Sequence, residues 1–307
     1  MPVYNGERYL AGAIESVLQQ THGDFEFIVV NDGSTDRTQE IIDRYAARDG
    51  RMKVISQTNA GQAESLNRAL ATANNEWVAI LDADDICMPH RLETQLGALR
   101  REPLIRVLGS HAVQIDQWGA EQGTRAVGPG SVPEFRRLAE QGGQVVLVHP
   151  SVMMHRPTIL ALGGYDASFG AAADIELWSR ASDEHVVVSL PETLIYYRTH
   201  PANMSMTRFF EQRLMMRWTL SRQQARRRGL PQPTLEEYQR PHSGWSKLQS
   251  LDHKRKDRGE CLIARSALAW REGCRLRALL LRGAALALLP ALVTTRVAGR
   301  RARKKKP

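Results

Sequence analysis

Residues 77–85 read Trp-Val-Ala-Ile-Leu-Asp82-Ala-Asp84-Asp85, an apolar run that ends in three carboxylates within four positions. The run predicts a strand that delivers the carboxylates to its end. Because side chains alternate along a strand, we expect Asp82 and Asp84 on one side, with Asp85 joining them where the chain bends. Such oxygen ligands suit Mg²⁺ or Mn²⁺, which complete their coordination with substrate phosphates. An acidic turn exposed to solvent explains the same residues, since aspartate is common in turns.

The first 110 residues alternate short β-rich runs with helical periods, which predicts a parallel sheet covered by helices. Polar loops then fall at the carboxyl ends of strands, where open α/β sheets bind ligands. The expected strands cover residues 25–30, 53–56 and 77–81; the expected helices cover 7–20 and 62–72, with one around 41–45 and another opening at Pro89.

The opening segment, Met1 to Gly6, reads as a loop that ought to follow a strand, although no strand precedes it. We therefore expect a start codon assigned too late, with roughly four to eight apolar strand residues missing upstream. A stop codon directly upstream of Met1 would rule this out.

Composition separates the chain into an acidic body and a basic tail. The 307 residues are 42% hydrophobic, and residues 1–206 carry 17 Lys/Arg against 26 Asp/Glu, whereas residues 207–307 carry 25 against 7. The first part is therefore −9 and the second +18. This division suggests that the tail meets a polyanion. Cys87, Cys261 and Cys274 lack paired spacing, which favours a reducing compartment, and no signal peptide opens the chain.

Four sequence blocks occur in a fixed order: Pro2-Val-Tyr-Asn5, Val30-Asn-Asp-Gly-Ser-Thr-Asp36, Asn59-Ala-Gly61 and Leu81-Asp-Ala-Asp-Asp85. Over residues 1–205 they resemble glycosyltransferase family 2, the inverting transferases with the GT-A fold. The resemblance implies a Rossmann-like domain with a mostly parallel sheet flanked by helices. It also implies an EC 2.4 enzyme that moves a sugar from a nucleotide-diphosphate sugar, first of all a UDP-sugar, to an acceptor hydroxyl.

The resemblance also implies roles for individual residues. Asp84 and His200 would ligate the metal, which is Mg²⁺ or Mn²⁺, and Asp85 would be auxiliary. Physical chemistry asks for the same parts, because a metal stabilises the diphosphate as negative charge develops on it. Asp32 suits a uracil N–H or ribose hydroxyls, although a plain Asp-Gly turn explains it too. The residues that would bind the nucleotide sugar are Pro2, Val3, Tyr4, Asn5, Asp32, Gly61, Asp82, Ala83 and Arg198.

The second half of this region is expected to supply the acceptor site and the catalytic base. Residues 163–166 followed by 173–178, Ala-Asp174-Ile-Glu-Leu-Trp178, resemble the family segment in which a Glu-Asp pair precedes a helix. Asp174 aligns with the Asp of that pair and is the expected general base. A helix N-cap is its alternative role. The chain departs from the pattern at Ala173, where the family usually has Glu, and Glu176 points to another helix face.

Two further loops carry histidine. His149 follows an apolar run and reads as part of an acceptor loop or as a structural histidine. We expect Trp178 to be a core residue; a platform for the sugar is its alternative role. Arg198 and His200 resemble the family's closing loop, in which Arg and His approach the diphosphate or the metal. Solvated loop residues are the alternative for both.

Residues 206–307 lie outside the resemblance and read as a helical, basic extension. Residues 276–295 are apolar but interrupted by Arg282 and Pro290. The uninterrupted part is too short to span a bilayer and suits a membrane-interface helix. Residues 296–307 add seven Lys/Arg that would grip anionic lipid. A core helix with a solubilising tail is the alternative. Nucleic acid is not an expected partner, because aromatics do not interleave the basic run.

These observations predict an inverting glycosyltransferase of cell-surface polysaccharide or glycoconjugate synthesis. We expect it in the cytoplasm, peripheral on the inner face of the cytoplasmic membrane, where it would meet a lipid-linked acceptor. A noncatalytic nucleotide-sugar-binding or scaffold protein is the alternative, which Ala173 and the absent first strand keep open. A nucleotidyltransferase would need a basic Gly-rich triphosphate loop, and none is visible near the N-terminus.

Overall fold

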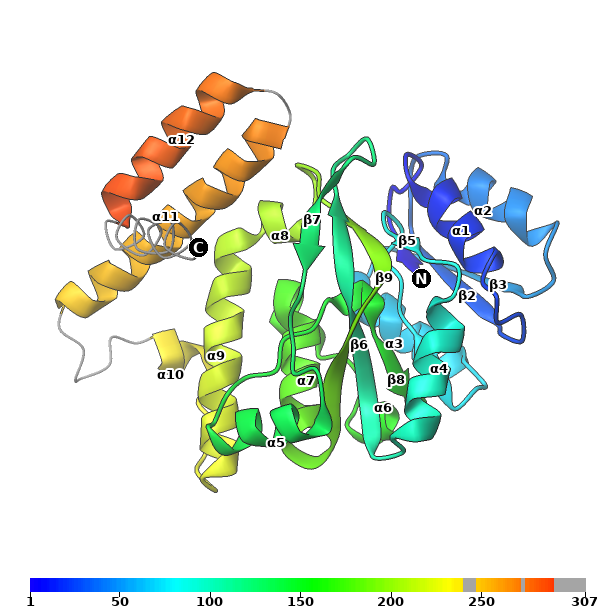
Figure 1. Ribbon diagram of the computed structural model, residues 1–307, viewed down its shortest axis with the longest axis horizontal. Coiled ribbons are helices and arrows are strands. Elements are labelled where there is room, and N and C mark those ends of the chain that lie inside the picture. The colour runs from blue at the N-terminus through cyan, green and yellow to red at the C-terminus, as the bar shows by residue number, and fades with distance from the viewer. Residues whose placement is uncertain (240–246, 272–273, 290–307) are drawn as a thin grey trace, which may run out of the picture. The chain divides into compact units, whose positions relative to one another are not determined.

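A computed structural model describes residues 1–239, 247–271 and 274–289 (Figure 1). The chain forms two compact units, one made of residues 1–198 and 219–232, the other of residues 199–218 and 233–307. The first unit contains both sheets, and the second is helical where the structure describes it. Cys87, Cys261 and Cys274 are free thiols.

A three-stranded parallel sheet opens the first unit, in the order β1-β2-β3. The segment expected to be a loop begins with a strand, because Pro2 and Val3 pair with Val30 and Asn31. The expected helix at residues 62–72 is present with these bounds. The strands and helices of this region are β1 (Pro2–Val3), α1 (Leu10–Leu18), β2 (Phe27–Asp32), α2 (Thr38–Ala46), β3 (Met52–Gln57) and α3 (Gln62–Thr72).

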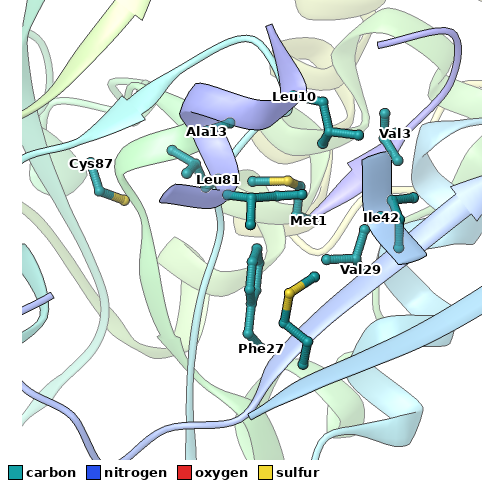
Figure 2. Packing of buried hydrophobic residues seen from close by; sticks show 11 residues of the cluster. Met1, Val3, Leu10, Ala13, Phe27, Val29, Ile42, Leu81 and Cys87 are labelled. Carbon is teal, nitrogen blue, oxygen red and sulfur yellow. The ribbon is translucent and has the colours of Figure 1, made fainter. Parts of the chain in front are cut away.

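Apolar side chains cover both faces of this sheet, as the period of its helices predicts. On one face, residues of α1 and α2 pack on alternate residues of β2, and Figure 2 shows this cluster. On the other face, Ala69 and Ala73, within and just after α3, pack against Ile28 and Val30. The cluster of the first face contains Met1, Val3, Leu10, Ala13, Ile14, Phe27, Val29, Ile42, Met52, Leu81 and Cys87.

A cavity of about 330 Å³ lies between β2, α3 and the strand at residues 77–79. Its lining is mainly apolar and includes Phe27, Leu70, Val78 and Met153. The residues predicted to bind the donor, the metal or the acceptor do not line it, so this cavity is distinct from the candidate site.

The second sheet has six strands and is mixed, with the path β4-β8-β6-β9-β5 and β7 beside β6. Only β6 and β9 are parallel neighbours here; the other pairs are antiparallel. The expectation of a mostly parallel sheet therefore holds for the first sheet alone. The elements are β4 (Trp77–Ala79), β5 (Ile86–Cys87), α4 (Arg91–Arg101), β6 (Ile105–Ile115), β7 (Glu121–Arg125), α5 (Val132–Glu140), β8 (Met153–His155), α6 (Arg156–Ala161), α7 (Ala173–Glu184) and β9 (Val186–Arg198).

Helix α4 places a buried arginine beneath the end of β4. Arg91 is 1% exposed, and its Nη2 donates to the carbonyl oxygens of Ile80 at 2.8 Å and Val152 at 3.2 Å. Its Nε donates to Gln95, whose amide donates to the carbonyl oxygens of Leu108 and Ser151. Carbonyl oxygens thus satisfy the guanidinium, which ties β4 to the segments beside it.

The remaining helices are α8 (Met204–Thr207), α9 (Phe209–Arg227), α10 (Leu235–Gln239), α11 (Lys247–Arg271) and α12 (Arg275–Leu288). Within residues 1–239, 247–271 and 274–289, no helix combines the length and the apolar character needed to cross a membrane. The expected interface segment is described up to residue 289, whereas residues 290–295 and the polybasic tail at 296–307 lie outside the described residues.

Candidate active site

The acidic segment forms a turn between β4 and β5. The strand ends at Ala79, and the backbone N–H of Asp85 donates to the carbonyl of Asp82 at 3.2 Å. Strand alternation therefore does not set the direction of these carboxylates, contrary to expectation. Asp85 is 1% exposed, whereas the side chain of Asp82 is 23% exposed. Asp85 thus anchors the turn from inside, and Asp82 faces the site.

The buried carboxylate of Asp85 is only half satisfied. Its Oδ1 accepts from the backbone N–H of Arg198 at 2.6 Å, whereas Oδ2 has no hydrogen-bond partner. Burial raises the pKa of Asp85 well above its ordinary value, and the charges of Asp84 and Asp82 raise it further. Three carboxylates that repel one another, with one oxygen unpartnered, fit a hard divalent cation that shares its coordination with phosphates.

The described residues do not on their own complete a metal centre. No group of three or more His, Cys, Asp or Glu side chains in the described part of the chain is arranged to hold an ion. A cation bound here would need ligands from the donor or from water, as Mg²⁺ and Mn²⁺ commonly do. His200 belongs to the second compact unit, so its role as a metal ligand beside Asp84 stays a prediction.

Arg198 fixes the acidic turn to the end of β9. Its Nε donates to the carbonyl of Asp84 at 2.8 Å, and its Nη1 donates to the carbonyl of Asp116 at 3.2 Å. The guanidinium carbon lies 4.6 Å from the ring centroid of Tyr9, and the residue is 7% exposed. Through these contacts Arg198 positions the acidic turn. The pair of hydrogen bonds that it is expected to donate to phosphate stays a prediction.

Asp32 organises the neighbouring loop. It is 3% exposed, and its carboxylate accepts from the backbone N–H groups of Ala60 and Gly61, each at 2.8 Å, and from Gln57 Nε2 at 2.7 Å. Three of about four acceptor positions are therefore filled within the protein. Gly61 has φ of 93° at the start of α3, a conformation that favours glycine. Asp32 therefore holds the loop at residues 60–61, and its expected contact with a nucleotide stays a prediction.

The first loop is held against the segment after β2. Asn5 Oδ1 accepts from the backbone N–H of Thr35 at 2.8 Å, and the N–H of Asn5 donates to Ser34 Oγ at 3.0 Å. The bonds keep Asn5 at φ of 49° and leave Tyr4 54% exposed. Pro2 and Val3 lie in β1, where Val3 is buried, so Tyr4 is the residue of this block most available to stack on a base.

His149 lies near two of the carboxylates that the sequence singles out. Its Nδ1 lies 3.9 Å from Asp82 Oδ1, and Gln62 Nε2 donates to the same oxygen at 3.0 Å. Burial lowers the pKa of His149, but Asp82 and Asp174 together raise it above the ordinary value. The fold therefore brings the predicted residues Asp82, His149 and Asp174 together. Ala83, also predicted, can offer a ligand only its backbone and its methyl group.

Asp174 lies in the first turn of α7, two residues after the N-cap Ala172, so the N-cap role is wrong. Burial raises the pKa of Asp174, and His149 partly offsets this rise. Trp178 is fully buried, with its ring centroid 6.3 Å from that of His149, and it is a core residue behind the site.

Glu176 does not take the place of the missing family glutamate at Ala173. It forms an ion pair with Arg180, with Nη2 to Oε2 at 2.6 Å, and Arg180 also donates to the carbonyl of Gly164 at 2.7 Å. Glu176 therefore supports the loop at residues 162–164 and has no free carboxylate oxygen directed to the base.

Sequence reasoning missed Gln62 and Tyr165 as site residues. Gln62 bonds Asp82, Asn67 bonds the backbone of Tyr165, and the hydroxyl of Tyr165 lies 3.0 Å from His149 Nε2. The Gly163-Gly164 pair before Tyr165 was the available signal, because paired glycines mark a constrained loop.

The fold is that of the GT-A glycosyltransferases, with a helical C-terminal region. At 18% sequence identity it matches the crystal structures of S. aureus TarS with UDP (TM-score 0.55; 97% of this chain, 90% of that chain) and with UDP-GlcNAc (TM-score 0.56, same coverage). The mannosyltransferase PcManGT of Pyrobaculum calidifontis, in complex with GDP-Man and Mn²⁺, also matches at 18% identity (TM-score 0.56; 99% and 79%). These likenesses concern the fold.

Residues 1–161 match the model of Glycosyl transferase family 2, and the chain belongs to this family. It is 36% identical over 188 residues to EpsE of Bacillus subtilis, covering 60% of this chain and 66% of EpsE. It is 32% identical over 232 residues to the uncharacterized glycosyltransferase MJ1057 of Methanocaldococcus jannaschii, covering 72% and 76%. The protein is therefore a family 2 glycosyltransferase.

Proposed function

We propose that this protein inverts the anomeric centre of a sugar as it moves the sugar from a nucleotide diphosphate to an acceptor hydroxyl in cell-surface polysaccharide or glycoconjugate synthesis. One observation carries the proposal: Asp82, after β4, and Asp174, in α7, both interact with His149. A donor-side carboxylate and a candidate base from distant parts of the chain therefore converge. A UDP-sugar is the first donor to test, since TarS binds UDP-GlcNAc, followed by GDP-Man.

Asp174 is the general base in this proposal. Its carboxylate takes the proton of the acceptor hydroxyl while that oxygen attacks the anomeric carbon opposite the leaving diphosphate, and a single displacement inverts the centre. The raised pKa of Asp174, caused mainly by burial, makes the carboxylate a stronger base near neutral pH. Asp82, partly exposed and bonded by Gln62, is the donor-side carboxylate of this proposal.

A bound Mg²⁺ or Mn²⁺ would stabilise the negative charge of the departing diphosphate. Asp84 is the proposed protein ligand, and the resemblance adds His200. The unpartnered Oδ2 of Asp85 supports a cation at this turn. Arg198 keeps the turn in place through the carbonyl of Asp84.

Asp174→Asn tests the base. We expect transfer to fall by about 10²- to 10⁴-fold, the usual contribution of a general base, with unchanged affinity for UDP. Asp166→Asn is the matched control, because Asp166 precedes the same helix but only caps a turn, through the backbone N–H of Ser168 at 2.9 Å. Unchanged transfer in Asp174→Asn refutes the role. Donor binding by the wild type with neither transfer nor donor hydrolysis would favour the noncatalytic alternative.

Asp84→Ala tests the metal. Titration calorimetry with UDP, with and without Mn²⁺, is expected to show tighter binding with Mn²⁺ in the wild type and no such gain in the variant. Equal affinity of the wild type under both conditions would overturn the metal assignment.

We also propose that residues 1–205 are the catalytic domain and that residues 206–307 attach it to the cytoplasmic face of a membrane, where a lipid-linked acceptor resides. Helix α12 supports this through its exposed side. Ala278 and Ala285 are buried, whereas Leu276 is 74% and Leu280 68% exposed. At 100° per residue, the exposed leucines 276, 279, 280 and 286 share one arc, and arginines 275, 277 and 282 flank it.

Vesicle sedimentation tests this surface. The double variant Leu276→Asp with Leu280→Asp is expected to lose binding to vesicles of phosphatidylcholine with anionic phosphatidylglycerol. Leu230→Asp is the matched control, because Leu230 is 56% exposed in the turn after α9. Equal binding by all variants would assign membrane attachment to another part of the chain. Absence of binding by the wild type would refute membrane attachment altogether.

A further inference from the structure

A tyrosine loop beside the candidate base is held by side chains from two helices. Asn67 of α3 donates through Nδ2 to the carbonyl of Tyr165 at 2.8 Å and accepts through Oδ1 from its backbone N–H at 2.8 Å. Arg180 of α7 holds the carbonyl oxygens of Gly164 and Leu162. The backbone at Tyr165 is therefore fixed on both sides.

Tyr165 in turn fixes the ring of His149. Its hydroxyl lies 3.0 Å from His149 Nε2, and the rings meet edge to face, with centroids 5.8 Å apart and planes at 88°. Tyr165 is 3% exposed, and burial, with Asp174 and Asp82, raises its pKa well above the ordinary value. The phenol therefore stays protonated, and its O–H can donate a hydrogen bond to His149 Nε2.

This contact has a consequence for the other ring nitrogen. When a neutral imidazole accepts a hydrogen bond at Nε2, its proton resides on Nδ1. Nδ1 faces Asp82, 3.9 Å from Oδ1, so this proton points toward the carboxylate of the donor side. Protonation of the ring adds a proton at Nε2 and leaves the one at Nδ1 in place.

We propose that Tyr165 and Asn67 are positioning residues that hold His149 with its Nδ1–H directed at Asp82, beside Asp174. The proposal rests on the proposed function, because its purpose is to keep the donor-side carboxylate and the base in a fixed relation. Neither residue touches the reacting atoms. The hydrogen bonds that connect them span 98 residues of sequence from Asn67 to Tyr165 and 16 from Tyr165 to His149.

Tyr165→Phe tests the proposal, because it removes the hydroxyl and keeps the ring. We expect kcat to fall by about tenfold, the effect of one net hydrogen bond, with KM for the nucleotide sugar unchanged. Tyr45→Phe is the matched control, since it removes a phenol hydroxyl that bonds Glu15 away from the site. Thermal midpoints of both variants check that they fold.

Nitrogen-15 NMR of the imidazoles gives a readout that needs no turnover. The His149 signals are identified by their loss in His149→Gln. The wild type is expected to show one fixed Nδ1–H tautomer, and Tyr165→Phe a tautomer average. In a double-mutant cycle, Asn67→Ala combined with Tyr165→Phe is expected to be no slower than the slower single variant.

Different results would overturn the positioning role and the proposed function. An unchanged tautomer in Tyr165→Phe, or additive losses in the cycle, would overturn the positioning role while transfer by the wild type stands. Absence of transfer by the wild type with every donor would instead overturn the proposed function, and the tautomer result would still decide how Tyr165 acts on His149.

Discussion

Gly164 gives the sharpest test of how the tyrosine loop is held. A Cβ built on Gly164, which has φ of 70°, would lie 2.5 Å from Asn67 Oδ1. Gly163, with φ of 88°, has no atom within 4 Å of such a Cβ. Alanine at either position meets backbone strain of about 1–2 kcal/mol, but only at Gly164 does it also displace Asn67 from its two bonds to Tyr165.

The expected difference follows from those two bonds. At about 1 kcal/mol of net stabilisation each, Gly164→Ala should lower the free energy of unfolding by about 2 kcal/mol more than Gly163→Ala. Urea denaturation followed by tryptophan fluorescence measures both variants. Gly164→Ala should also slow transfer, because Tyr165 would shift from His149. Equal destabilisation of the two variants would refute the claim that Asn67 is bound tightly against this loop.

Three further outcomes are expected. The pKa of Asp85 is raised in the folded state, first by burial and then by the charges of Asp84 and Asp82. The fold is therefore more stable at low pH, where Asp85 is neutral, and loses that stability as pH rises and Asp85 ionises. Asp85→Asn should therefore raise the thermal midpoint in EDTA at pH 8 and not at pH 4, and an equal shift at both pH values would contradict this. Burial raises the pKa of Asp174 and protonated His149 lowers it, so His149→Gln should move the acid limb of kcat/KM to higher pH; an unmoved limb would count against the pairing. Arg198→Lys loses donors to the carbonyl of Asp84, so UDP affinity with Mn²⁺ should fall by about tenfold in calorimetry, and unchanged affinity would show that the turn holds without it.

Local patterns predicted the first 110 residues well. The apolar period over residues 62–72 predicted α3 with its observed bounds, and the buried run at residues 25–30 predicted β2 within two residues at each end. Both signals act within one element, where periodicity alone decides which face is buried.

Beyond β4, the second sheet carries no comparable local signal. Strand β5 has two residues, Ile86 and Cys87, which pair with Tyr196 and Ile195 more than 100 positions away. Such short antiparallel pairs are stabilised by tertiary contacts that no sequence window contains. The expectation of a mostly parallel sheet failed here for that reason.

Motifs located the carboxylates of the site but not the groups that hold them. The role of Arg198 shows why: its sequence context indicated phosphate, whereas its guanidinium meets backbone carbonyl oxygens, which every residue offers. Asn67 likewise bonds a backbone N–H and C=O. Bonds to the backbone leave no trace in the identity of the partner residue.

Arg91 ties the segment just before the acidic turn to the buried core. Its guanidinium joins the carbonyl of Ile80, two residues before the acidic turn, to that of Val152. Loosening the turn would therefore cost a buried charge two of its acceptors. Amides around Ile80 should therefore exchange with solvent as slowly as those of the central strands. We therefore expect the acidic turn to keep its conformation when a donor binds, and movement to occur in exposed segments such as the loop that carries Tyr4.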